Sequence, residues 1–186
     1  MTPPVIPGDV VTTELHRIAD DYDYWDTNHA LISYSWDGSE LSVGLLAVLD
    51  SSIEPDDYPE ILARTVQQYL LAKSDDSPAA YMLQFEGFGA FKPQDDAPEE
   101  EKQAFEEARK NHTFYELPGS IEYLILLMAD VYGRVWSLQK NRATGEITEK
   151  FYHPTSIVHG TQAKGLRSIA LATGMVRHGL IPGSAN

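Results

Sequence analysis

The sequence predicts a single α+β domain built on a largely antiparallel sheet of about six strands. The expected elements follow the order helix, two strands, helix, strand, helix, three strands, helix, so strands pair as hairpins and do not alternate strictly with helices. A chain of 186 residues, 42% of them hydrophobic, can bury one core. Neither an internal repeat nor a linker rich in glycine and serine divides it, so we expect one domain over 1–186, with flexible ends at 1–9 and 179–186.

The first expected elements are a helix over residues 13–25 and the hairpin that follows it. Thr12 or Thr13 can cap this helix, whose apolar residues fall on one stripe. The stretches "ALISYSW" and "ELSVGLLAVL" predict two strands around a turn at Asp37-Gly38. Because the second stretch is almost wholly apolar, we expect it to form a central strand.

The middle of the chain predicts two helices around one strand. Asp57 at the cap, Pro59 in the first turn and Glu60 at the third helical position form a capping box for the first of these helices. The stretch "AAYMLQFEGFGAF" then predicts a strand. The next helix begins with the same arrangement at Asp96, but it has few apolar positions, so we expect it to lie on the surface.

The last third of the chain predicts three strands and a final helix. The strands lie within "SIEYLILLMADVYGRVWSLQKNRATGEITEKFYH", with turns at Gly133 and Gly145. The helix is expected over residues 161–173, with Thr161 as its cap and Gly174 as the left-handed residue that ends it.

The triplet His159-Gly160-Thr161 resembles the opening of ADP-ribosyltransferase-type folds, including the RNA 2′-phosphotransferases. In those families the His and Gly contact the nicotinamide nucleotide, and a helix with an "I…G" pattern follows, here with Ile169 and Gly174. The triplet lies early in those chains and most of the sheet follows it, whereas only 25 residues follow Thr161 here. We therefore interpret the triplet as the start of a structural helix.

The charge of the chain, −14 overall, is distributed unevenly. Residues 1–60 carry −12, residues 61–120 carry −5 and residues 121–186 carry +3. An acidic first third disfavours direct binding of nucleic acid, because its phosphates would be repelled. It suits a basic protein partner or the imitation of nucleic acid, although acidic surfaces also serve only to keep a protein soluble.

We predict a non-enzymatic regulatory domain, such as an inhibitor or accessory factor, that binds a basic protein through its acidic half. The predicted binding residues form two patches. The first consists of Asp20, Asp21, Asp23, Asp56 and Asp57, and the second of Asp95, Asp96, Glu99, Glu100 and Glu101. We expect this acidic surface to lie apart from the basic residues of the last third, so that it is free for the partner.

The alternative is a small-molecule sensor or enzyme, because the order of elements is similar to that of GAF, PAS and profilin-like folds. Such a protein would use Glu86, Asp130 and His153 near the strand ends. A carboxylate at Asp130 is either exposed at the end of its strand or buried with a raised pKa, as a general acid or base requires.

No signature of a cofactor, metal centre or membrane segment is present in the sequence. The chain has no cysteine and its six histidines show no metal-binding spacing, so we expect neither a metal nor a cofactor. No catalytic triad order or nucleophile elbow supports an enzyme. The start of the chain lacks the pattern of a signal peptide and the apolar runs are short, which favours a cytoplasmic location without membrane contact.

Overall fold

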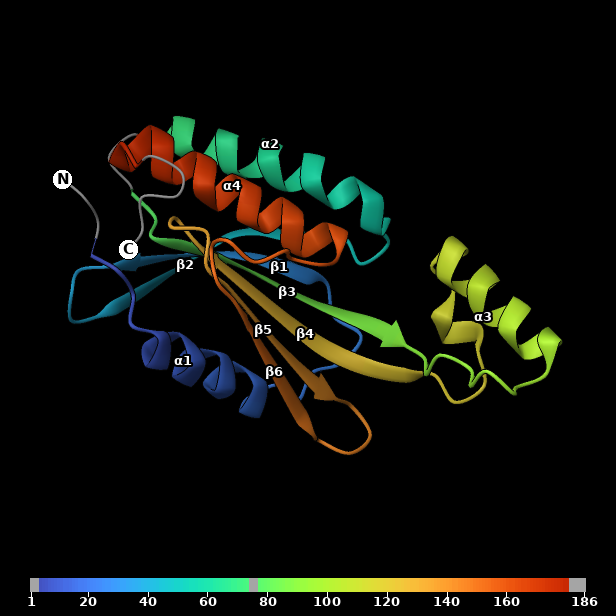
Figure 1. The fold of residues 1–186 in the computed structure, drawn as a ribbon. Coiled ribbons are helices and arrows are strands. Elements are labelled where there is room, and N and C mark those ends of the chain that lie inside the picture. The colour runs from blue at the N-terminus through green and yellow to red at the C-terminus, as the bar shows by residue number, and fades with distance from the viewer. Residues whose placement is uncertain (1–3, 74–76, 181–186) are drawn as a thin grey trace.

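The computed structural model describes residues 4–73 and 77–180, which form four α-helices and one six-stranded antiparallel sheet (Figure 1). The helices are α1 (Gly8–Asp20), α2 (Tyr58–Ala72), α3 (Glu99–Asn111) and α4 (Thr161–His178). The strands are β1 (His29–Trp36), β2 (Leu41–Leu49), β3 (Ala80–Gly89), β4 (Ile121–Asp130), β5 (Val135–Asn141) and β6 (Ile147–Tyr152). Two short 3₁₀ turns, η1 (Pro55–Asp57) and η2 (Phe114–Glu116), complete the order, which confirms the predicted α+β fold.

The sheet has the strand order β2-β1-β3-β4-β5-β6, and each strand runs antiparallel to its neighbours. Helices α2 and α4 cover one face and α1 covers the other (Figure 1). The central strands are therefore buried on both sides. On β3, Tyr81 and Leu83 face the α2–α4 layer while Met82 faces α1, and all three are fully buried. This two-sided burial explains the nearly continuous apolar runs in β3 and β4.

Strand β2 lies at one edge of the sheet, so the prediction of a central strand is wrong. Leu46, Ala47 and Leu49 pack toward the core beneath α2, whereas Val43, Leu45 and Val48 are exposed. An apolar strand is usually buried on both faces, but here nothing in the described structure covers the face that carries these exposed residues.

Helix α1 begins and ends about five residues earlier than the sequence pattern indicates. It starts at Gly8 after Pro7 and ends at Asp20, and no threonine side chain caps it. Ile6, which lies within the predicted flexible end, is buried in the α1-side core. The remaining parts of the predicted ends, 1–3 and 181–186, lie outside the described residues.

Helix α4 continues through Gly174 to His178, and Gly179 ends it with a left-handed φ of 64°. The prediction that Gly174 ends the helix is therefore wrong. A Cβ atom at Gly174 would lie 2.6 Å from the carbonyl oxygen of Val131, so glycine is required there for the helix to approach the β4–β5 turn. Thr161 is the first helical residue and forms no side-chain cap, whereas Gly160 turns the chain with a φ of 87°.

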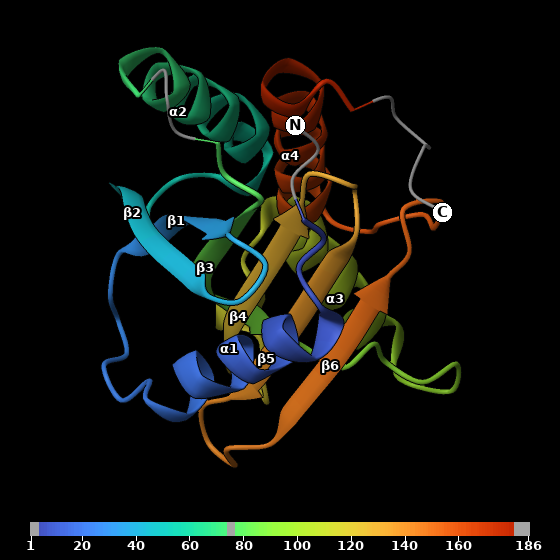
Figure 2. The same ribbon diagram turned by 90° about the vertical axis from the view of Figure 1, so that its left-hand side faces the viewer.

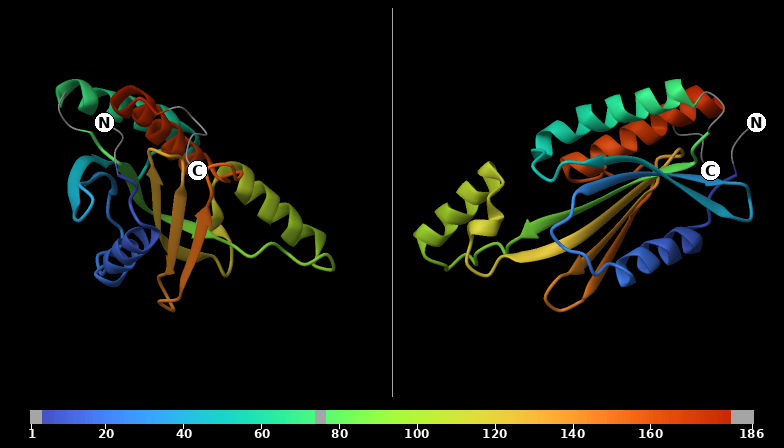
Figure 3. Two further views of the ribbon diagram at one scale, coloured as in Figure 1. Left: turned by 60° about the vertical axis from the view of Figure 1, so that its left-hand side comes forward. Right: turned by 180° about the vertical axis from the view of Figure 1, so that it is seen from behind.

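Helix α3 projects beyond the end of the sheet, away from the other helices (Figure 3). Ala108 is its one buried residue, which confirms the predicted surface position. Ring contacts connect it to the sheet in two steps, from Phe105 to Phe114 of η2 and from Tyr115 to Phe88 of β3. Within the described ranges, no helix has the length and apolar character needed to cross a membrane.

Candidate functional site

One end of the sheet collects most of the acidic residues of the chain. Here β1 and β4 begin and β2 and β3 end, and the β5–β6 hairpin turns. The segments at this end, residues 20–28, 50–57, 90–120 and 142–146, contain 17 acidic and five basic residues. We call this region the acidic end.

The opposite end of the sheet is close to neutral. Its connections over the described residues 37–40, 73, 77–79, 131–134 and 153–160 contain two acidic residues and two basic residues. Charge is therefore polarised along the strand direction, because the antiparallel topology returns acidic segments from distant parts of the chain to the same end.

All ten carboxylates of the predicted binding surface are exposed and belong to the acidic end. Asp20, Asp21 and Asp23 lie at the end of α1, on the other side of the sheet from Asp56 and Asp57 in η1, so the first predicted patch is divided between two layers. The second patch lies around the start of α3 (Figure 1).

These carboxylates are almost entirely without charged partners. Within residues 4–73 and 77–180, Asp21 is the one member of the ten that forms an ion pair, at 3.3 Å from Arg17. Asp57 precedes α2 as predicted, but its carboxylate caps no backbone N–H, so the capping box is not formed. Helix α3 starts after Pro98 rather than Asp96. Glu99, Glu100 and Glu101 occupy its first turn, where their negative charges interact favourably with the helix dipole.

A second group of acidic residues at this end is paired and holds the 21–28 loop in place. Arg142, after β5, donates to the carboxylate of Asp26 at 3.0 Å and also binds Glu122, while its guanidinium lies 5.1 Å from the ring centroid of Trp25. Glu86 of β3 accepts the backbone N–H of Asp26 at 2.8 Å. These bonds hold Asp26 in a left-handed conformation with a φ of 64°.

The carboxylates of Asp26, Glu86 and Glu122 lie within 4.8 Å of one another. Because Arg142 binds two of the three, we interpret this cluster as a charge-paired clamp that positions the loop, not as a metal centre.

The clamp contradicts the expectation that acidic and basic parts lie apart. Arg142 pairs with an acidic residue of the first third, and Lys140 donates from Nζ to the carbonyl oxygen of Ala19 at 2.6 Å, at the end of α1. Spacing along the chain gave no sign of these contacts, because only the strand register brings the residues together. In this register, Glu86 of β3 lies opposite Leu124 of β4, and Tyr123 of β4 lies opposite Asn141 of β5.

The trio considered for a sensor or enzyme is not brought together. Glu86 is opposite Leu124 on β4, six residues from Asp130, which corresponds to about 20 Å along the strand. His153 lies exposed after β6 and its Nδ1 is 2.9 Å from the hydroxyl of Thr155. This combination therefore cannot act as one catalytic group.

Asp130 is buried, with 1% of its surface exposed. Burial raises the pKa of its carboxyl group, and the guanidinium of Arg134 opposes this shift. Its carboxylate also accepts the backbone N–H groups of Tyr132 and Arg134, so Asp130 shapes the β4–β5 turn.

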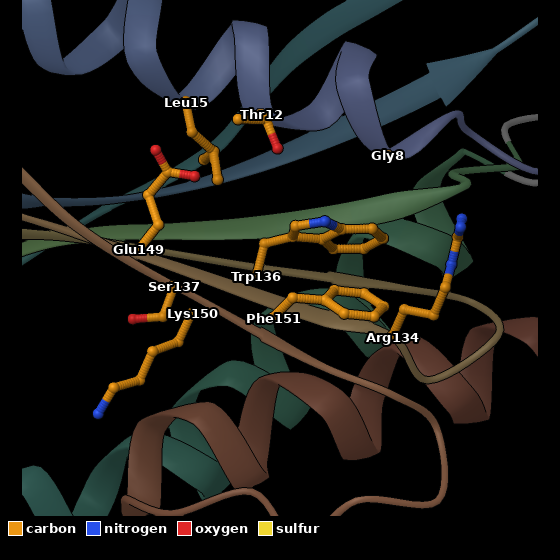
Figure 4. A pocket seen from close by; sticks show the side chains of 9 residues that line it. All are labelled: Gly8, Thr12, Leu15, Arg134, Trp136, Ser137, Glu149, Lys150 and Phe151. Carbon is orange, nitrogen blue, oxygen red and sulfur yellow. The ribbon is translucent and has the colours of Figure 1, made fainter.

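A groove of about 450 Å³ lies between α1 and the β5–β6 hairpin (Figure 4). The rings of Trp136 and Phe151, 5.2 Å apart, form its floor, and the side chains of Ser137 and Lys150 point away from it in Figure 4. The complete lining is Gly8, Thr12, Leu15, Arg134, Trp136, Ser137, Glu149, Lys150 and Phe151.

The charged groups inside this groove are already paired. Arg134 binds Asp130 at one end, and Glu149 binds His16 at the other. The groove thus offers an aromatic floor but no free charge that would orient a polar ligand.

His159 and Gly160 lie in the loop before α4, and Thr161 is the first residue of that helix, which contacts η1. His159 and Gly160 are exposed, and no strand follows α4 in the part of the chain that the structure describes. The described strands all precede the triplet, whereas in the ADP-ribosyltransferase-type folds most of the sheet follows it.

No family model matches this chain, and no similar curated protein or solved structure was found.

Proposed function

We propose that this protein is a non-enzymatic interaction domain that binds a basic protein partner through its acidic end, as an inhibitor or accessory factor. The observation that carries the proposal is the convergence of 17 acidic residues against five basic ones at one end of the sheet. Nine of the ten carboxylates in the binding surface lack an ion-pair partner among the described residues, so their charge is available to another molecule.

The arrangement of the acidic end favours a macromolecular partner. Its carboxylates are spread over the end of α1, η1 and the projecting α3, and Figure 3 shows α1 and α3 well apart from one another. A dispersed field of one sign accelerates the encounter with an oppositely charged protein surface and selects against acidic partners.

Charge reversal at the acidic end tests the proposal. The variant Asp23→Lys/Asp95→Lys changes two exposed, unpaired carboxylates from different segments. The matched control Asp9→Lys/Leu71→Lys/Val176→Lys changes the net charge equally, at exposed residues of α1, α2 and α4 near the opposite end. Immobilised wild type, variant and control are exposed to a lysate of the producing cells, and each captured protein is identified, purified and titrated.

We expect a basic protein to bind wild type and control with the same affinity and the variant much more weakly. Equal binding to all three chains would contradict the proposal, as would a captured partner whose binding surface is acidic.

The same proposal predicts weak binding of nucleic acid. Titration with duplex DNA and single-stranded RNA at about 150 mM salt should give dissociation constants no tighter than the non-specific range of about 10⁻⁴ to 10⁻⁶ M. Sub-micromolar binding would show that the basic residues of the last third form a nucleic-acid surface, and the acidic end would then not define the function.

A further inference from the structure

Strand β2 presents an open edge without the usual protection against strand pairing. Its nine residues contain no charge and no proline, and in the described structure its backbone pairs with β1 alone. Three large apolar side chains on it are exposed, Val43 by 56%, Leu45 by 64% and Val48 by 61%. Proteins commonly block such edges with charged side chains, proline or a covering segment, because an open edge accepts another strand.

The opposite edge of the same sheet shows that protection. Strand β6 carries Glu149 and Lys150 in adjacent positions, both exposed. Figure 2 shows the sheet from one end of its strands, with β2 at one edge and β6 at the other. The difference between the two edges therefore lies in their side chains.

The exposed apolar residues of β2 all lie on the face that α1 covers farther along the sheet. Val43, Leu45 and Val48 are directly opposite Tyr34, Ile32 and Ala30, which alternate along one face of β1. Tyr34 and Ile32 belong to the α1-side core. Helix α1 packs mainly against β5, so the apolar strip on β2 continues the core beyond the helix that covers it.

A β-bulge limits where a partner strand can pair. Leu31 is opposite Ala47 and Ile32 is opposite Leu45, so Leu46 is the extra residue. The regular part of the edge is therefore residues 41–45, which is long enough for a short strand.

Charge around β2 determines which occupant fits. Glu40 precedes the strand, and Asp50 follows it at the acidic end. Antiparallel pairing of two copies along the whole strand would bring Glu40 of one near Asp50 of the other, and parallel pairing would bring Glu40 near Glu40. In any register, two chains that each carry a net charge of −14 would meet. Either arrangement places like charges together, whereas a strand with basic residues at its ends would meet opposite charges.

We infer that the β2 edge binds an extended segment of a partner protein, an alternating apolar strand flanked by Lys or Arg, which adds a seventh strand to the sheet. This inference rests on the proposed function for the basic character of the partner. Backbone hydrogen bonds along 41–45 would supply affinity, and Val43 and Leu45 would contact the alternate side chains of the segment.

The test uses the full chain and a synthetic probe peptide, Val-Thr-Val-Thr-Val with two lysines at each end. We expect peptide binding to slow amide hydrogen exchange in residues 41–45. A peptide of the same sequence with alternate N-methylated amides, which cannot form the ladder, should not bind, and glutamate in place of lysine should weaken binding about tenfold or more.

The variant Leu45→Lys places a charge on the edge at an exposed position, and Val176→Lys, at a residue of α4 that is 76% exposed, is the matched control. Leu45→Lys should weaken the peptide about tenfold or more while Val176→Lys leaves it unchanged, with both variants melting as wild type does.

Three results would overturn the inference. The first is that about 1 mM peptide does not slow amide exchange in residues 41–45, and the second is that the peptide binds Leu45→Lys as tightly as wild type. The third is that wild type is a dimer which Leu45→Lys converts to a monomer, because this would assign the edge to a second copy. Failure here leaves the acidic end untouched, because that proposal is tested separately, by the binding of the captured partner to Asp23→Lys/Asp95→Lys.

Discussion

Arg134 and Asp130 form an ion pair across the turn between β4 and β5, with 2.6 Å between guanidinium Nη2 and a carboxylate oxygen. Nη2 of Arg134 also donates to the carbonyl oxygen of Ile6 at 2.8 Å, and the guanidinium lies 4.8 Å from the ring centroid of Trp136. The pair thus joins the segment before α1 to the sheet, and it compensates the charge of a carboxylate that is almost fully buried.

Replacing Arg134 by Met should destabilise the protein by about 3–5 kcal/mol at neutral pH, because it leaves a buried carboxylate without its partner. Urea unfolding followed by circular dichroism measures this difference. The double variant Asp130→Asn/Arg134→Met, which removes both charges, should recover part of the loss. A loss below about 1 kcal/mol for the single variant would show that Asp130 is well solvated or otherwise compensated.

The deficit of Arg134→Met should shrink as the pH falls. Burial raises the pKa of Asp130 in the folded state, and removing Arg134 removes the main opposing effect. The folded variant therefore binds a proton at a higher pH than the unfolded chain, whose aspartate has a pKa of about 3.9. Its free energy of unfolding should approach that of wild type between neutral pH and about pH 4, and the double variant should show no such approach.

His29 should make the protein less stable in mild acid. Its Nδ1 contacts the hydroxyl of buried Tyr58, and burial lowers the pKa of the imidazole, with Glu86 and Asp50 partly opposing this shift. The unfolded state, with a histidine pKa of about 6.5, binds the proton first as the pH falls, so the free energy of unfolding should decrease below that pH.

Unfolding of wild type and His29→Phe between pH 8 and pH 5 measures this effect, with the exposed His153→Ala as control. The decrease should be smaller in His29→Phe and unchanged in His153→Ala. The same decrease in all three chains would assign the acid sensitivity to other groups.

Helix α4 should contribute to stability and not to nucleotide binding. Leu166 is fully buried between α4 and the sheet, so Leu166→Ala should destabilise by about 2–5 kcal/mol. His159→Ala, in an exposed loop, should leave the melting temperature nearly unchanged. An increase in melting temperature with NAD⁺ that wild type shows and His159→Ala lacks would instead support a transferase-type site.

The sequence was sufficient to predict the fold because local patterns and burial agree over most of the chain. The apolar runs around Met82 and Met128 predict strands, and both residues are buried in the middle of the sheet. The prediction of a central position for β2 was wrong because it rested on the absence of charged residues, and both a central strand and an open edge strand can lack charge. Gly174 was likewise misinterpreted, because glycine is common at helix ends but here allows α4 to pack closely against Val131.

The candidate site was predictable in its residues but not in its arrangement. Runs of acidic residues at Asp20, Asp56 and Asp95 are visible in the sequence, and exposure follows from their polarity. That they share one end of the sheet depends on the strand order. The clamp of Asp26 and Arg142 depends on register between segments that are 116 residues apart, for which the chain offers no local signal.

The association rate constant of the captured partner, measured over a series of salt concentrations, tests the role of the acidic end most directly. If exposed charges steer the encounter, the rate for wild type and Asp9→Lys/Leu71→Lys/Val176→Lys should fall steeply as salt shortens the screening length, which is about 8 Å at physiological ionic strength. Asp23→Lys/Asp95→Lys should associate more slowly and depend less on salt. Equal rates for the three chains, or a wild-type rate that does not change with salt, would contradict the proposal that the acidic end is the binding surface.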